Sequence, residues 1–140
     1  MRVLALDHGT RRVGVAVSDT LKMIAQPLEF IPAEPFPDCL ARIRELIRVQ
    51  EVELILVGMP RNMDGSYGEA AARVREFVSV LKESILVPIR TWDERLTSVQ
   101  AERFLREGGT KGRDQRRKVD QAAAAVLLQS YLDSLTPPMG

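Results

Sequence analysis

The first residues, "MRVLALDHGTRRVGVAVSD" (1–19), hold two β-rich runs, "RVLALDH" (2–8) and "RVGVAVSD" (12–19), separated by "GTR". Two such runs around a short polar break predict a β-hairpin. The first run is apolar over residues 3–6 and then reaches Asp7, a residue type that disfavours sheets. A carboxylate there is costly to desolvate unless a positive charge lies against it. The stretch therefore predicts a buried strand ending in an acid whose partner comes from elsewhere.

The chain has 140 residues, the size of one domain, and we expect a single domain over residues 1–136 followed by a tail, 137–140. With 45% hydrophobic and 28% charged residues the composition is that of a globular protein. No apolar run approaches the ~20 residues of a membrane span, and the N-terminus lacks the layout of a signal peptide. We therefore expect a cytoplasmic protein that does not bind membranes.

Two residue counts exclude whole classes of chemistry. Cys39 is the only cysteine, so the chain has no internal disulfide and no cysteine cluster for zinc. His8 is the only histidine, which excludes a Ser-His-Asp triad and a His-rich metal site. If its strand alternates regularly, His8 points away from the face that carries Asp7, which favours a structural role over that of a lone base.

The rest of the chain changes from period 2 to helical periodicity and back. A third strand is expected at "PLEFIPA" (27–33), which extends the antiparallel set. The later elements are predicted as a helix at 38–50, a buried strand at 53–60, a helix at 69–82, a strand at 86–92, a helix at 97–106, a basic loop at 111–118 and a helix at 119–135. This order predicts an α/β fold with a mixed sheet, an antiparallel meander followed by parallel strands, in which the first strand lies centrally.

Acidic residues recur where strands and helices of such a fold meet. In "TWDERLTS" (91–98), Asp93 and Glu94 come at the end of the last strand, and ligand sites of open α/β sheets gather at such ends. Asp120 is expected in the first turn of the final helix, where the helix dipole alone would also explain an acid. If the last strand alternates, Asp93 and Glu94 point in opposite directions, and we prefer Glu94, with Asp93 as the alternative.

Together, Asp7, Glu94 and Asp120 indicate a metal site. Three carboxylates brought together repel one another unless cations lie between them. Hard oxygen ligands suit Mg²⁺ or Mn²⁺, and two such ions ~3.5–4 Å apart can activate water and stabilise the leaving oxygen of a phosphodiester.

Other residues near these acids have two interpretations each. Gly9 either lets a phosphate or a metal-bound water approach the backbone beside Asp7 or serves the hairpin turn. Thr10 either bonds a phosphate oxygen or shapes the turn. The run "KGRDQRRK" (111–118) is either a solvated loop or a loop that grips phosphates just before Asp120, and its basic residues are Lys111, Arg113, Arg116, Arg117 and Lys118.

With these stretches identified, the sequence resembles the YqgF family, whose members are described as pre-16S ribosomal RNA nucleases and as Holliday junction resolvases. The matching segments are "LALDHGTRRVGVAVSD" (4–19), "VGMPRNMDGS" (57–66), "DERLTSVQAE" (93–102) and "VDQAAAAVLLQSYL" (119–132). They occur in the family's order and span nearly the whole chain.

The resemblance implies an RNase H-like fold with a five-stranded mixed sheet flanked by helices. It places the family's three acids on Asp7, Glu94 and Asp120. The stretch "GMPRNMDGS" (58–66) either is a strand-to-helix turn built on Asp64-Gly65 or contacts a nucleic-acid backbone through Arg61 and Asn62, and the resemblance favours the contact. Arg95 either contacts phosphate or pairs with a nearby acid.

The leading hypothesis is a metal-dependent endonuclease for structured RNA, the ribosomal RNA precursor being what the resemblance implies. A resolvase of four-way DNA is the alternative, and symmetric cutting of two strands would require a homodimer. An ATP-dependent kinase or chaperone-like ATPase shares the "DHGTRRVGVAVSD" (7–19) pattern, but clamps its nucleotide between two such domains. A nucleic-acid binding module without catalysis is disfavoured by the intact acidic set.

Overall fold

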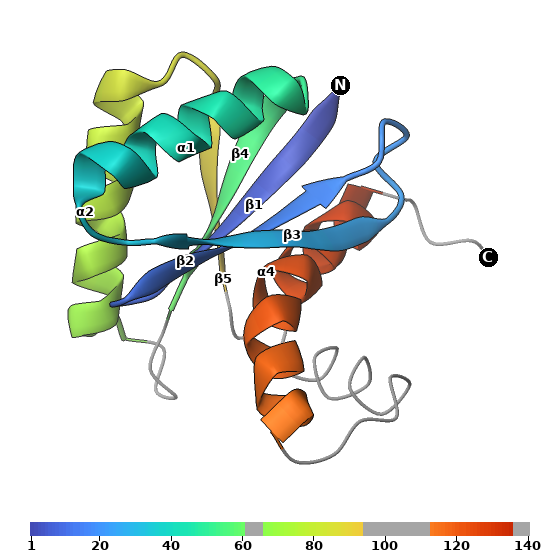
Figure 1. The fold of residues 1–140 in the computed structure, drawn as a ribbon. Helices are drawn as coiled ribbons and strands as arrows, with labels where there is room; N and C mark the ends of the chain where they lie inside the picture. Colours follow the sequence, from blue (N-terminus) through green and yellow to red (C-terminus); the bar gives the residue numbers. More distant parts are fainter. Residues whose placement is uncertain (61–65, 94–112, 136–140) are drawn as a thin grey trace.

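The computed structural model describes residues 1–60, 66–93 and 113–135, with the side chains of the last helix from residue 123 onward. Within these residues eight elements follow one another: β1 (Arg2–His8), β2 (Arg12–Ser18), β3 (Ala25–Pro32), α1 (Phe36–Val49), β4 (Val52–Met59), α2 (Glu69–Ser84), β5 (Ile89–Asp93) and α4 (Arg113–Leu135). The strands form one sheet in the order β3-β2-β1-β4-β5 (Figure 1).

The central strand is β1, as the sequence predicts. It pairs antiparallel with β2, which pairs antiparallel with β3, and it pairs parallel with β4, which pairs parallel with β5. The three parallel strands therefore end on one side of the sheet, at His8, Met59 and Asp93. We call this side the carboxyl end of the sheet, and it is where ligands of open α/β sheets bind.

Helices cover both faces of the sheet, with α1 and α2 on one face and α4 on the other (Figure 1). Alternate residues of β1 belong to different cores because successive strand side chains point to opposite faces. Leu4 and Leu6 pack in the core under α1 and α2. Val3 and Ala5 pack in the core under α4. This alternation decides which face each residue at the carboxyl end occupies.

The predicted strands and helices are found, with shifted bounds, wherever the structure describes them. The last strand is shorter than predicted and runs from Ile89 to Asp93. The predicted helix at 97–106 and the tail at 137–140 lie outside the described residues. No helix in the described part of the chain has the length and apolarity to cross a membrane.

One prediction is wrong: the basic run is not a loop from Arg113 onward, because α4 begins there. Arg, Gln and Lys have high helix propensity, and neither Gly nor Pro interrupts the chain between Arg113 and Leu135. Asp120 consequently lies beyond the first turn of α4. The stabilising effect of a helix dipole on an acid falls off within the first turn, so it does not explain Asp120.

Candidate active site

Asp7 is a half-buried carboxylate at the carboxyl end of β1. It continues the alternation of Val3 and Ala5 and therefore lies on the face covered by α4. No side chain in the described part of the chain forms an ion pair with it. A carboxylate in this position, without a protein cation among those residues, suits a bound cation.

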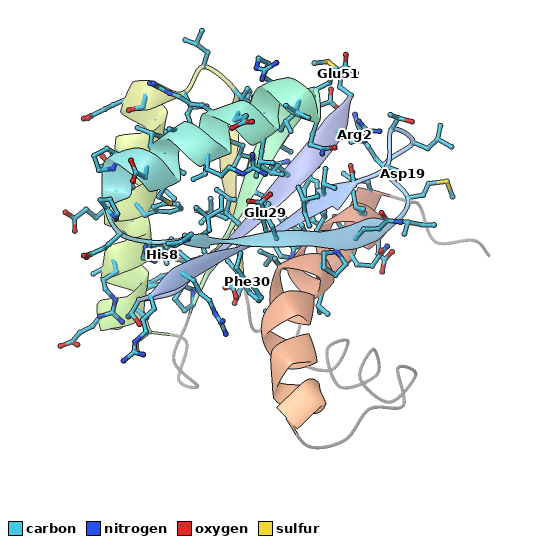
Figure 2. The ribbon with its side chains drawn as sticks, in the orientation of Figure 1. Arg2, His8, Asp19, Glu29, Phe30 and Glu51 are labelled. Carbon is cyan, nitrogen blue, oxygen red and sulfur yellow. The ribbon has the colours of Figure 1, made fainter. Side chains whose placement is uncertain are left out.

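His8 occupies the opposite face of the sheet, as the alternation predicts. The ring of His8, which Figure 2 labels, packs against Phe77 of α2. The two ring centroids lie 4.5 Å apart. Burial lowers the pKa of His8, and the positive charge of Arg73 lowers it further, whereas Asp7 raises it. Its burial and its ring contact with Phe77 favour a structural role for His8.

The end of β5 is joined to α4 by Trp92. Its indole Nε1 donates a hydrogen bond to Oγ of Ser130 at 3.1 Å, and its ring meets Tyr131 edge-to-face at 5.3 Å. Trp92 therefore lies on the α4 face, and the alternation of β5 places the next residue, Asp93, on the face of α1 and α2. Asp7 and Asp93 thus occupy opposite faces, which favours Glu94 over Asp93 as the partner of Asp7.

Asp120 is carried by the helix that covers the face of Asp7. The helical repeat puts position 120 on the same side of α4 as Ala124, which is fully buried against the sheet. Positions 113, 116 and 117 also share this side of α4, whereas position 118 does not. Positions 113, 116, 117 and 120 therefore fall, by the helical repeat alone, on the side of α4 that packs on the sheet in the second half of the helix.

The donor set is compatible with divalent metal ions, since carboxylate oxygens are the ligands that Mg²⁺ and Mn²⁺ prefer. Among the described residues, no three His, Cys, Asp or Glu side chains are grouped to hold a metal ion. Two members of the predicted set fall outside that search, because neither Glu94 nor the side chain of Asp120 is among the described groups.

Gly9 closes the hairpin between β1 and β2. Its N–H donates to the carbonyl oxygen of Arg12 at 2.9 Å, and a Cβ built on Gly9 would lie 2.8 Å from that oxygen. The hairpin alone therefore explains why a glycine stands there. Thr10 is exposed in the same turn.

The predicted nucleic-acid contacts are only partly described. Arg61, Asn62, Arg95 and Lys111 lie outside the described residues. Besides Gly9 and Thr10, the structure gives the helical backbone of four further predicted contacts, Arg113, Arg116, Arg117 and Lys118.

Sequence reasoning missed one pair of residues beside Asp7. The guanidinium carbon of Arg12 lies 4.4 Å from the ring centroid of Phe30. Figure 2 labels Phe30 on β3. The two residues come from β2 and β3 and meet only because these strands pair. Nothing in the spacing along the chain signals such a contact.

Comparisons with known proteins agree with this architecture. The sequence model of the RuvX family, described as Holliday junction resolvase, matches residues 1–134. A Halothermothrix orenii protein named "Putative pre-16S rRNA nuclease" is 45% identical over 133 residues, which cover 95% of this chain and 95% of that protein. A Caldanaerobacter subterraneus protein of the same name is 46% identical over 135 residues, covering 96% and 97% of the two chains.

Solved structures show the same fold at low sequence identity. RuvC from Thermus thermophilus superposes with a TM-score of 0.60 at 16% identity, over 97% of this chain and 98% of that one. RuvC of the same organism in complex with a Holliday junction substrate gives a TM-score of 0.59 at 18% identity, over 96% of both chains. The RNase H-like fold expected from the sequence is confirmed. The chain therefore belongs to the RuvX family of Holliday junction resolvases, also called YqgF, and by family membership it is a nuclease.

Proposed function

We propose that this protein is a metal-dependent endonuclease for structured nucleic acid, and that it processes the 5′ end of pre-16S ribosomal RNA in the cytoplasm. The observation that carries the proposal is the position of Asp7. It is a half-buried acid at the carboxyl end of the central strand, on the face covered by the helix that carries Asp120. The names of the relatives support the choice of ribosomal RNA precursor.

Two Mg²⁺ or Mn²⁺ ions would be held by Asp7, Glu94 and Asp120. Bound there, they would supply an activated water and stabilise the leaving 3′ oxygen. The chain's own contribution is rigidity, because Asp7 is fixed by strand pairing on both sides of β1. The hydrogen bond between Trp92 and Ser130 holds β5 and α4 together. Glu94 follows directly after β5, and Asp120 belongs to α4.

Basic side chains would bind the backbone of the substrate. Three arginine positions on α4, 113, 116 and 117, share one side of the helix with Asp120. Arginine binds phosphate bidentately, so a row of arginines leading to an acid suits a phosphate chain entering a metal site. The remaining proposed contacts are Gly9, Thr10, Arg61, Asn62, Arg95, Lys111 and Lys118.

A Holliday junction resolvase is the second candidate. The description of the family favours it, and so does the fold shared with a RuvC that is bound to a junction. The same acids would cut DNA by the same chemistry. Symmetric cutting of two strands would require two copies of the chain.

The deciding experiment compares wild type with Asp7→Asn on end-labelled pre-16S RNA and on a four-way DNA junction, each with Mg²⁺, Mn²⁺ or EDTA. Asp38→Asn is the matched control, because it makes the same change in the first turn of α1, on the other face of the sheet. We expect RNA cleavage by wild type and by Asp38→Asn, with Mg²⁺ or Mn²⁺ only, and none by Asp7→Asn. Cleavage of the DNA alone would reverse the substrate assignment, and equal cleavage by Asp7→Asn would refute the site.

A further inference from the structure

We propose that two copies of this chain associate through the amino end of the sheet and form a symmetric dimer. The amino end is the side on which β1, β4 and β5 begin, and it lies opposite the carboxyl end that carries Asp7. The dimer does not depend on the proposed nuclease function. One consequence of the dimer, the use of two separate substrates, rests on that function.

Exposed apolar side chains are concentrated at the amino end. Of the eight large apolar side chains that are exposed among the described residues, seven lie there, and Tyr67 is the exception. The seven precede a parallel strand, belong to the loop between β2 and β3 or end α4, and these places share one end of the sheet (Figure 1). They are Met1, Leu21, Met23, Ile24, Val49, Leu86 and Leu135. Single exposed apolar residues are normal, but such a concentration marks an interaction surface.

The loop between β2 and β3, residues 19–24, presents three of these side chains. Leu21, Met23 and Ile24 are 75%, 65% and 58% exposed. Hydrogen bonds close the loop beneath them, because Oδ1 of Asp19 accepts from the N–H groups of Met23 and Ile24 at 2.8 and 3.1 Å. The N–H of Asp19 donates to the carbonyl oxygen of Ile24 at 3.1 Å. The three apolar side chains are therefore held outward by a closed loop.

Contacts with α4 and β4 anchor the same loop. The side-chain amide of Gln129 donates to the carbonyl oxygen of Met23 at 3.0 Å and accepts from the N–H of Ala25 at 2.9 Å. Lys22 forms an ion pair with Glu53, near the start of β4. A surface that is fixed before association loses little conformational entropy when a partner covers it. The loop is thus suited to be the centre of an interface.

Charges of both signs surround these apolar side chains. Arg48 in the last turn of α1 and Glu51 before β4 are exposed, and neither forms an ion pair within the described part of the chain. Figure 2 labels Glu51, Arg2 and Asp19 at this end of the sheet. A nucleic-acid backbone or an anionic membrane selects positive charge alone. A second copy offers each acid a base and each base an acid, because a two-fold axis brings the same patch to both sides.

One end of this molecule is large enough for such an interface. The accessible surface of the protein is 8983 Å². A stable interface takes about 800 Å² from each partner, roughly a tenth of the surface of a small protein. Because a two-fold interface uses the same surface on both copies, assembly stops at the dimer.

The dimer would hold its two candidate active sites apart. β1 has seven residues and is therefore ~20 Å long, so association through the amino ends leaves Asp7 about 40 Å or more from the partner's Asp7. The two carboxyl ends face away from each other. Under the proposed function each site takes its own substrate, which suits single cuts in RNA better than paired cuts in one DNA junction.

Sedimentation equilibrium of the full chain, from about 5 to about 200 μM, tests the surface. We expect wild type to dimerise with a Kd in the micromolar range or tighter, and Leu21→Glu and Met23→Glu each to raise this Kd at least about tenfold. Tyr67→Glu is the matched control, because it places the same charge at an exposed apolar side chain outside the amino end, and it should match wild type. Both test positions are exposed, so folding should be kept, and thermal unfolding verifies this.

Distances between spin labels test the geometry of the dimer. Cys39 is buried, so a cysteine introduced by Thr10→Cys beyond β1 or by Gln26→Cys at the start of β3 can be labelled selectively. We expect the two Gln26→Cys labels of a dimer to lie closer together than the two Thr10→Cys labels, which should be about 40 Å or more apart.

The outcomes separate this inference from the proposed function. A wild type that stays monomeric up to about 200 μM, or a dimer that both glutamate variants leave unchanged, would overturn the proposed surface without touching the nuclease assignment. Thr10→Cys labels closer together than Gln26→Cys labels would overturn it too, because the dimer would then form through the other end. A dimer with the expected distances that cleaves neither RNA nor DNA would support the surface, and only the proposed function would fail.

Discussion

Asp7 and His8 are adjacent in β1 and lie on opposite faces of the sheet, His8 against Phe77 of α2 and Asp7 toward α4. One strand end thus carries two titratable groups with separate surroundings. The ring of His8 packs against Phe77, whereas Asp7 lies on the face of the sheet that is covered by α4, the helix that contains Asp120. The face of Asp7 is therefore where chemistry is expected, and the other face supports it.

Replacing Asp7 should separate the stability of the fold from its stabilisation by metal ions. Asp7→Asn removes a half-buried charge that no described side chain pairs with, so its thermal unfolding temperature without metal should equal or exceed that of wild type. A cation that binds only the folded state raises this temperature. Millimolar Mg²⁺ or Mn²⁺ should therefore stabilise wild type and not Asp7→Asn, as measured by calorimetry. An equal shift in both proteins would place the metal elsewhere.

His8 should make stability depend on pH. Its pKa in the folded state is lowered below the ordinary value of a histidine, mainly by burial, so the unfolded chain binds more protons in this range. Stability should therefore be full above the unfolded pKa and fall as the pH drops from there toward the lowered folded pKa. Unfolding temperatures at about pH 7.5 and about pH 5.5 should differ more for wild type than for His8→Phe, which keeps a ring on Phe77. An identical difference in the two proteins would contradict this assignment.

The joint between β5 and α4 should have a measurable coupling energy. Trp92→Phe removes the hydrogen bond to Ser130 and keeps a ring against Tyr131. Each single variant, Trp92→Phe or Ser130→Ala, should lose about 0.5–1.5 kcal/mol of unfolding free energy. In urea titrations the double variant should lose less than the sum, since both changes remove one bond. Additive losses would mean that the bond contributes nothing.

Gly9→Ala should damage the hairpin that supports Asp7. The added Cβ would lie 2.8 Å from the carbonyl oxygen of Arg12, which is backbone and cannot rotate away. Overpacking of this kind costs about 1–3 kcal/mol, which urea unfolding would detect. Thr10→Ala is the control, because this exposed neighbour in the turn should change stability by less than about 0.5 kcal/mol.

The parts of the fold that could be predicted from the sequence are those with strong local signals. The hairpin of β1 and β2 has alternating β-rich runs around a turn, and the central position of β1 follows from the change from antiparallel to parallel connections. The predicted start of α4 is wrong, because a run of charged residues was taken to indicate a loop. Arg, Gln and Lys favour a helix, and α4 begins at Arg113.

The proposed site was harder to predict because it combines residues from distant parts of the chain. Asp7 can be recognised from the sequence because it directly follows the apolar residues 3–6 of a predicted strand. Arg12 and Phe30 carry no such signal, since their contact depends on the register between β2 and β3. The hydrogen bond from Trp92 to Ser130 places Trp92 on the α4 face, whereas the preference for Glu94 over Asp93 stays a prediction.

The two acids after Trp92 can be told apart by experiment. Asp93 falls on the face of α1 and α2, opposite Asp7, because Trp92 before it is held on the α4 face. Asp93→Asn should therefore keep metal-dependent cleavage within about tenfold of wild type, and Glu94→Gln should lose about a thousandfold or more in kcat, as removal of a metal ligand or a transition-state contact does. The measurement is single-turnover cleavage of labelled RNA over a Mg²⁺ titration, with circular dichroism to verify folding. A loss in Asp93→Asn with activity retained in Glu94→Gln would exchange their roles, because the alternation of β5 would then have to break after Trp92.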